Sequence, residues 1–192
     1  MKTNLPKMTN EEFNALSDEQ KRIEIAKDVI AALKAKKLSA GQMVYVNNTN
    51  IDDIIRQDGS QQLQPLLIET QKECQVCAKG ALFVCDVIRR NEFKVSKSVT
   101  SIDSDIILQK LEYFSESQLN LIETAFEGDT KQEEGLVELD EEGDAKYDEN
   151  FDVIYIPVVK QAIKFSKRFT NDTNRMIAIM KNIIENNGEF KP

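Results

Sequence analysis

The stretch Cys74-Gln75-Val76-Cys77-Ala78-Lys79-Gly80-Ala81-Leu82-Phe83-Val84-Cys85 decides how this chain is expected to fold. Its cysteines and alanines recur at steps of three and four residues, which is the spacing of one face of an α-helix. We therefore predict a helix that begins near Pro65 and carries every cysteine on its inward face. Lys79, Asp86 and Arg89 lie away from that face.

The three cysteines are predicted to be core residues rather than chemical groups. In the predicted helix, Cys74 lies more than two turns from the start, whereas a reactive dithiol of the thioredoxin type lies at a helix N-terminus. A structural zinc site takes four Cys or His ligands, and this chain has three cysteines and no histidine. A metal site shared across a dimer and a redox role are the alternatives. No cofactor is expected.

Capping signals predict further helices in the first half of the chain. A short helix follows Thr9 or Asn10, and Ser17 with Gln20 forms a capping box for a longer helix that runs to about residue 36. That helix has an apolar stripe of Ile23, Ala26, Ile30 and Leu33. Residues 42–46, rich in β-branched and aromatic side chains, predict a strand that ends at Asn47-Asn48.

The second half of the chain shows the same helical signals. Residues 106–114 predict a helix, and Ser115 caps another with Leu119, Ile122 and Phe126 on its inward face. Residues 157–169 and a final helix, begun at 170–172 and ended by Asn187-Gly188, complete the pattern. The sequence therefore predicts a mainly α protein, with residues 1–192 as a single helical domain of about six helices and a minor strand or β-hairpin.

Composition predicts a soluble protein of a bacterial cytoplasm. The chain is 41% hydrophobic and 30% charged, and no apolar run approaches the roughly 20 residues of a membrane-spanning helix. The N-terminus has no apolar core of the kind a secretory signal requires, and the few cysteines fit a reducing compartment. No membrane partner is expected.

Residues 127–150 form an acidic insertion. They hold eleven acidic residues against two lysines, a balance of −9, so the rest of the chain is close to +1 when the total is −8. The spacing of acidic residues fails the EF-hand pattern, because Ala145 stands where a glycine is required and Phe151 where a glutamate is. We expect a mobile loop or a polar hairpin that turns at residues 141–144. Its candidate interaction residues are Glu133, Glu134, Asp140, Glu141 and Glu142.

Basic residues gather in the helices after the insertion. Four of them share one face of the predicted helix 157–169: Lys160, Lys164, Lys167 and Arg168. Such a face can contact nucleic-acid phosphates, but no aromatic residues alternate with the cations to stack on bases, and the chain has no tryptophan. It can equally dock against the acidic insertion or stay solvated. A protein partner is therefore favoured over nucleic acid, and an oligomer is an open alternative.

No enzyme signature is found. The sequence has no phosphate-binding Gly-rich loop, no nucleophile elbow and no zinc-protease motif, and the absence of histidine removes the commonest general acid or base. Three segments resemble small uncharacterised proteins of phages and bacterial mobile elements: Cys77-Ala78-Lys79-Gly80-Ala81-Leu82, the block from Phe114 to Glu123, and the ending from Asn171 to Gly188. The resemblance covers about half of the chain and implies no assigned activity or site.

Three hypotheses about function follow. The first is a non-enzymatic accessory protein of a phage or mobile element that binds a macromolecular partner through its acidic insertion and basic helix. The second is a binding protein for a small, nucleotide-type ligand, held by residues 47–50 with Arg89 and Arg90 around a helical pocket. The third is an enzyme of a type that these motifs do not identify.

Overall fold

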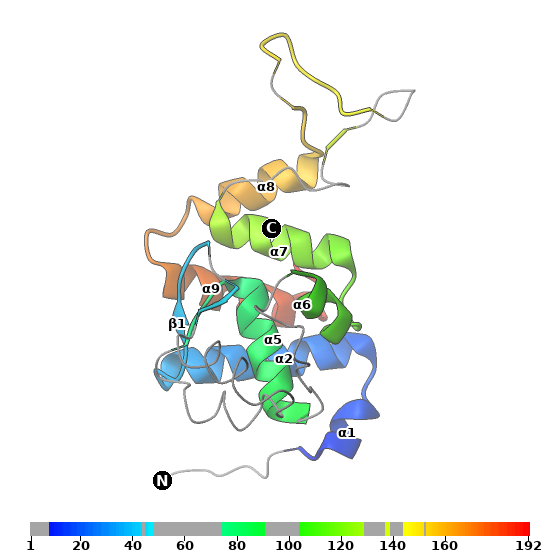
Figure 1. The fold of residues 1–192 in the computed structure, drawn as a ribbon, viewed down its shortest axis with the longest axis vertical. Coiled ribbons are helices and arrows are strands. Elements are labelled where there is room, and N and C mark those ends of the chain that lie inside the picture. Colours follow the sequence, from blue (N-terminus) through cyan, green and yellow to red (C-terminus); the bar gives the residue numbers. More distant parts are fainter. Residues whose placement is uncertain are drawn as a thin grey trace, which may run out of the picture.

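The protein is mainly helical. A computed structural model describes residues 8–43, 45–47, 74–90, 104–128, 137–138, 144–151 and 153–192. Figure 1 shows helices stacked into a body from which one segment, between α7 and α8, projects. The elements in chain order are α1 (Asn10–Asn14), α2 (Asp18–Lys34), β1 (Ser39–Ala40), β2 (Val46–Asn47), β3 (Gln75–Val76), α5 (Ala78–Arg90), α6 (Ser104–Lys110), α7 (Glu116–Glu127), α8 (Pro157–Ser166) and α9 (Asp172–Glu185).

The first two helices begin where the capping signals predict. The side chain of Thr9 accepts a hydrogen bond from the backbone of Glu12, and Ser17 does the same for Gln20. Both capping boxes are complete, and each cap contributes about 0.5–2 kcal/mol to helix stability. The buried face of α2 is formed by Ile25, Ala26, Val29 and Leu33, so the predicted stripe is correct at Ala26 and Leu33 and wrong at Ile23 and Ile30.

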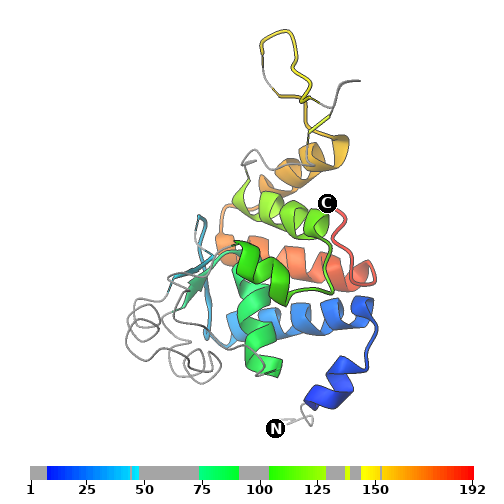
Figure 2. The same ribbon diagram turned by 45° about the vertical axis from the view of Figure 1, so that its right-hand side comes forward.

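Helix α5 is the centre of the body, where it contacts α2, α6, α7 and two strands. Figure 1 shows α5 crossing α2, and Figure 2 shows α7 stacked between α8 and α9. Every residue of α5 except Ile88 is buried. Lys79, Asp86 and Arg89, which lie away from the predicted inward face, are buried as well, because helices cover α5 on more than one side.

The predicted start of the cysteine helix is also wrong. Cys74 and Cys77 flank the strand β3, and the helix begins only at Ala78. The carbonyl of Cys77 accepts the first helical hydrogen bond, from the amide of Ala81 at 2.9 Å. The spacing gave the wrong helix start because Cys74 and residues 76–87 are buried almost without a break. In such a buried run, apolar residues at steps of three and four do not distinguish a helix from a strand. Pro65 lies outside the described residues.

The strands form a small mixed sheet with the order β1-β3-β2. β1 pairs with β3 in parallel, and β2 pairs with β3 antiparallel, with Val46 opposite Val76. The predicted strand at residues 42–46 is thus only partly correct, because Gln42 and Met43 form a turn and Met43 has a φ of 64°. The sheet brings the backbone of Tyr45 against Gly80, where any Cβ atom would overlap the carbonyl oxygen of Tyr45.

The C-terminal helices match their predicted signals. Ser115 caps α7, and Leu119, Ile122 and Phe126 are buried as predicted. Asn171 caps α9, which ends before two residues of positive φ, Asn187 and Gly188. α8 packs against α7 and α2 packs against α9. In α8 the buried face is Val159, Ala162 and Phe165, while Ile163 is only half-buried.

Among the described residues, no helix has the length and apolar character needed to cross a membrane.

Candidate interaction surface

The described part of the acidic insertion contains a hairpin. Tyr147 pairs antiparallel with Val153, and we call residues 144–151 and 153–155 the acidic hairpin. Residues 137–138 lie alongside it, because the amide of Lys146 donates to the carbonyl of Glu138 at 2.8 Å and the amide of Glu138 donates to Ile154 at 2.7 Å. The bond between Lys146 and Glu138 joins the two flanks of the predicted polar hairpin, whose turn at residues 141–143 lies outside the described residues. Both views show it standing away from the helical body (Figures 1 and 2).

The tip of the hairpin holds an aromatic side chain in solvent. The carboxylate of Asp148 accepts a hydrogen bond from the amide of Asn150 at 2.8 Å, and the Asp148 carbonyl accepts one from Phe151 at 3.1 Å. This turn leaves Phe151 with a φ of 63°, in the left-handed region that suits glycine and asparagine. The side chain of Phe151 is 87% exposed, and that of Tyr147 is 59% exposed. Sequence reasoning missed both aromatic residues, although Asp148 and Asn150 are ordinary turn signals.

The acidic residues named from the sequence lie outside the described residues. They are Glu133, Glu134, Asp140, Glu141 and Glu142. The described acidic side chains in solvent at the hairpin are Asp144, Asp148 and Glu149, which the prediction included only as part of the insertion. The hairpin therefore combines negative charge with exposed aromatic surface.

The basic residues named from the sequence lie together on α8 and the turn after it. Lys160, Lys164, Lys167 and Arg168 are all exposed, because α8 turns Val159, Ala162 and Phe165 toward the core and leaves the other side to solvent. The guanidinium of Arg168 lies 5.2 Å from the ring centre of Phe165. Residues 157–171 contain no acidic residue. We call these four cations the basic face.

Arg175, a basic residue further along the chain, is not part of the basic face. It is buried, and it donates to the carbonyls of Phe126 at 2.7 Å and Phe169 at 3.0 Å and to Asp172 at 3.2 Å. This side chain joins the end of α7 to the start of α9. Its role in the structure is to fix two helix termini.

Buried charges on α5 are the main feature that sequence reasoning missed. Lys79 is fully buried and lies 2.5 Å from the Glu123 carboxylate and 2.8 Å from the side-chain oxygen of Asn120, both on α7. Near the other end of α5, Asp86 accepts a hydrogen bond from the Tyr113 hydroxyl at 2.8 Å and pairs with Arg90 at 2.9 Å. These contacts tie α5 to its neighbours and replace the hydration that burial removes.

Burial also raises the pKa of Asp86 on α5 and of the two cysteines that flank β3. Burial raises the pKa of Asp86 above its ordinary value of 3.8, while Arg90, Tyr113 and Lys110 act in the opposite direction. Burial raises the pKa of the Cys74 thiol to about 12 and that of Cys77 to about 12. Cys77 does stand at a helix N-terminus, where its sulfur accepts a hydrogen bond from the Gly80 amide at 3.4 Å. The loss of hydration outweighs that donor, so the thiols stay protonated at neutral pH.

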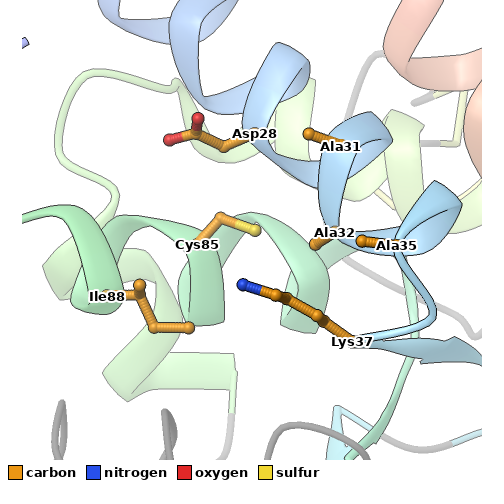
Figure 3. Close-up of a pocket in the computed structure, with 7 residues that line it drawn as sticks. All are labelled: Asp28, Ala31, Ala32, Ala35, Lys37, Cys85 and Ile88. Carbon is orange, nitrogen blue, oxygen red and sulfur yellow. The ribbon is translucent and has the colours of Figure 1, made fainter. Parts of the chain in front are cut away.

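A pocket of about 250 Å³ lies between the end of α2 and α5. Figure 3 shows the Lys37 amine and the Cys85 thiol facing into it from opposite sides. Arg89 and Arg90 do not line it; Arg89 pairs with Asp28 at 2.7 Å, and Arg90 with Asp86. Residues 48–50, which the predicted ligand site includes, lie outside the described residues. The remaining lining residues are Asp28, Ala31, Ala32, Ala35 and Ile88.

In the described ranges, no three carboxylate or thiol side chains are close enough to hold a metal ion together. Comparison with protein-family models, with curated proteins and with solved structures finds no match to the chain.

Proposed function

We propose that the protein is a non-enzymatic accessory protein of a phage or bacterial mobile element that binds a protein partner through the acidic hairpin. The observation that carries this proposal is Phe151, which is 87% exposed at the tip of a segment that projects from the body. The phage or mobile-element setting rests on the resemblance of the three short segments described above.

Two local properties of Phe151 favour a binding role. A residue other than glycine in the left-handed region costs about 1 kcal/mol or more, and asparagine or glycine would fit this turn better. An exposed aromatic ring also gains nothing from the hydrophobic effect within the monomer. Burying a phenylalanine side chain against a partner contributes about 1.5–3 kcal/mol, and aromatic residues are common among the side chains that dominate interfaces. A partner would therefore offset a local cost that the monomer alone does not.

The charges around Phe151 suggest what the partner surface is like. Asp148 and Glu149 place negative charge in the turn, and the exposed Asp144 and Lys146 lie further back along the strand. A basic partner surface with an apolar depression for the ring would complement it. Such charges mainly raise the association rate, so binding should weaken as salt screens them.

The proposal can be tested by affinity capture from a lysate of the source cells. Phe151→Asn removes the ring and suits the turn, so it should lose the captured partner while its thermal midpoint stays equal or rises. Met43→Ser is the matched control, because Met43 is also exposed, at 71%, and also has a positive φ, but lies away from the hairpin. Capture that is equal for wild type, Met43→Ser and Phe151→Asn would show that the tip is not the binding surface.

A second candidate function, the binding of a small ligand, is favoured by the pocket between α2 and α5. Its Lys37 amine and Cys85 thiol stand over small apolar side chains, and the Asp28 carboxylate that also lines it is paired with Arg89, so the pocket suits a small ligand with one anionic group. A nucleotide panel in a thermal-shift assay tests this. A ligand present at about 100 times its Kd stabilises the fold by about 2.7 kcal/mol, or about 5–11 °C at this chain length. Ala35→Phe should abolish that shift by filling the pocket.

A further inference from the structure

Three buried polar side chains meet where α5 packs against α7. Lys79 is fully buried, while Asn120 and Glu123, which share one face of α7 at a spacing of three residues, are 5% and 7% exposed. The Lys79 amine donates a hydrogen bond to the side-chain oxygen of Asn120 at 2.8 Å and lies 2.5 Å from the Glu123 carboxylate. The contact therefore places a nucleophilic amine, a carboxamide and a proton acceptor together in a site that water hardly reaches.

The amide group of Asn120 lies within reach of the Lys79 amine. A C=O bond is about 1.23 Å long, so this hydrogen bond leaves Cγ of Asn120 about 3–4 Å from Nζ of Lys79. Two reacting atoms about 3–3.5 Å apart are close enough for direct attack. Rotation about the Cβ–Cγ bond of Asn120 turns the face of its amide toward the amine. Among the described residues, the Asn120 side chain makes no other hydrogen bond, so no second partner holds the Nδ2 atom in place.

We propose that Lys79 forms an isopeptide bond with Asn120 inside the folded chain, with Glu123 as the proton acceptor. Glu123 takes a proton from the Lys79 ammonium, and the neutral Nζ then attacks Cγ of Asn120 to form the new C–N bond. The bond from Cγ to Nδ2 breaks, a second proton of the amine passes to Nδ2, and ammonia leaves. Glu123 keeps the first proton. The exchange balances without an oxidant, a reductant or a cofactor.

Burial favours this reaction. Taking two charges out of water costs free energy that their mutual attraction offsets only in part, and the reaction replaces the buried ion pair by a neutral amide and a neutral carboxyl group. The ammonia that leaves is diluted into the solvent, which opposes reversal. The ion pair in the structure is the state before the bond forms. The bond would join α5 to α7 covalently, a self-modification that is separate from the role of the acidic hairpin.

Intact-mass spectrometry of the purified full-length protein, incubated at neutral pH, tests the proposal. Wild type should be lighter by one ammonia than its sequence mass. A tryptic digest then locates the bond. Because an amide at Lys79 blocks cleavage there, the digest should contain one branched peptide that joins residues 73–89 to residues 111–131.

Three variants show whether the reaction depends on this site. Lys79→Met lacks the amine and should keep its full mass. Glu123→Gln has almost the same size but accepts no proton from the ammonium, so it should also keep its full mass. Glu116→Gln, the matched control, makes the same change at an exposed position of α7 and should lose ammonia as wild type does. Circular dichroism and thermal unfolding check that each variant folds.

The wild-type measurement decides the inference even where a variant fails to fold. A wild type that keeps its full mass throughout the incubation would overturn the proposal. A loss of ammonia that yields only linear peptides would also overturn it, because that result assigns the loss to a cyclised asparagine instead. A folded Glu123→Gln variant that loses ammonia as fast as wild type would overturn the role of Glu123.

Discussion

The buried pair between Lys79 and Glu123 gives the sharpest stability prediction. In Lys79→Met, Glu123 keeps its carboxylate in a site that is 7% exposed and loses the cation that lies 2.5 Å away. Removing one partner of a buried ion pair typically costs about 3–5 kcal/mol, because the remaining charge is left without compensation. At about 2–4 °C per kcal/mol for a chain of this length, the thermal midpoint should fall by about 6–20 °C.

Urea unfolding and calorimetry of three variants test that figure. Lys79→Met with Glu123→Leu removes both charges and should recover most of the loss, since apolar pairs of similar volume often replace buried ion pairs without cost. Lys160→Met makes the same chemical change on an exposed lysine and should stay within about 0.5 kcal/mol of wild type. Two results would refute the reasoning. One is that Lys79→Met lowers the unfolding free energy no more than Lys160→Met does, and the other is that the double variant is no more stable than Lys79→Met alone.

Other residues of α5 and its surroundings give three further predictions. Gly80→Ala should lower the unfolding free energy in urea by about 1–3 kcal/mol, although alanine favours helices, because its Cβ overlaps the carbonyl oxygen of Tyr45. Cys74 and Cys77, with thiol pKa values of about 12, should not react with a disulfide reagent at about pH 8 until urea unfolds the chain. Burial raises the pKa of Asp86 in the fold, so the native state holds this proton more tightly than the unfolded chain does. Its contribution to stability is thus present below pH 3.8 and lost as the pH rises through the folded pKa. Urea titrations at a series of pH values should show the stability of Asp86→Asn, relative to wild type, increasing over that range.

The sequence predicts those elements whose signals are local. Thr9, Ser17, Ser115 and the residues near Asn171 cap helices because a short polar side chain can satisfy free amides of the first turn in almost any tertiary setting. The same holds for the end of α9 at Gly188, where a positive φ favours glycine. Mainly helical architecture follows from such signals together with apolar spacing.

The start and surroundings of α5 could not be predicted in that way. A helix covered on several sides has no polar face, so Lys79 and Asp86 look like solvent-facing residues until the partners on other elements are known. Those partners, Glu123 and Tyr113, lie 44 and 27 residues away in the chain. β3 consists of two residues and is defined by pairing with distant strands rather than by its own composition.

The candidate surface was predictable in part. The spacing alone predicts the row of cations on α8, because this helix buries only one face and the cations lie on the opposite side. The role of Phe151 was not visible, because an isolated aromatic residue in a sequence is ordinarily a core residue. Only the backbone geometry of the turn, with its positive φ, places that ring in solvent.

A photo-crosslinking amino acid at position 151 tests the central claim most directly. The protein is irradiated with a lysate of the source cells or with an excess of the unlabelled protein. The group at position 151 should form one discrete adduct, whereas the same group at position 43 should form none. Adducts at both positions in equal amount would show nonspecific contact. No adduct at position 151, under conditions where the protein still captures a partner, would contradict the account.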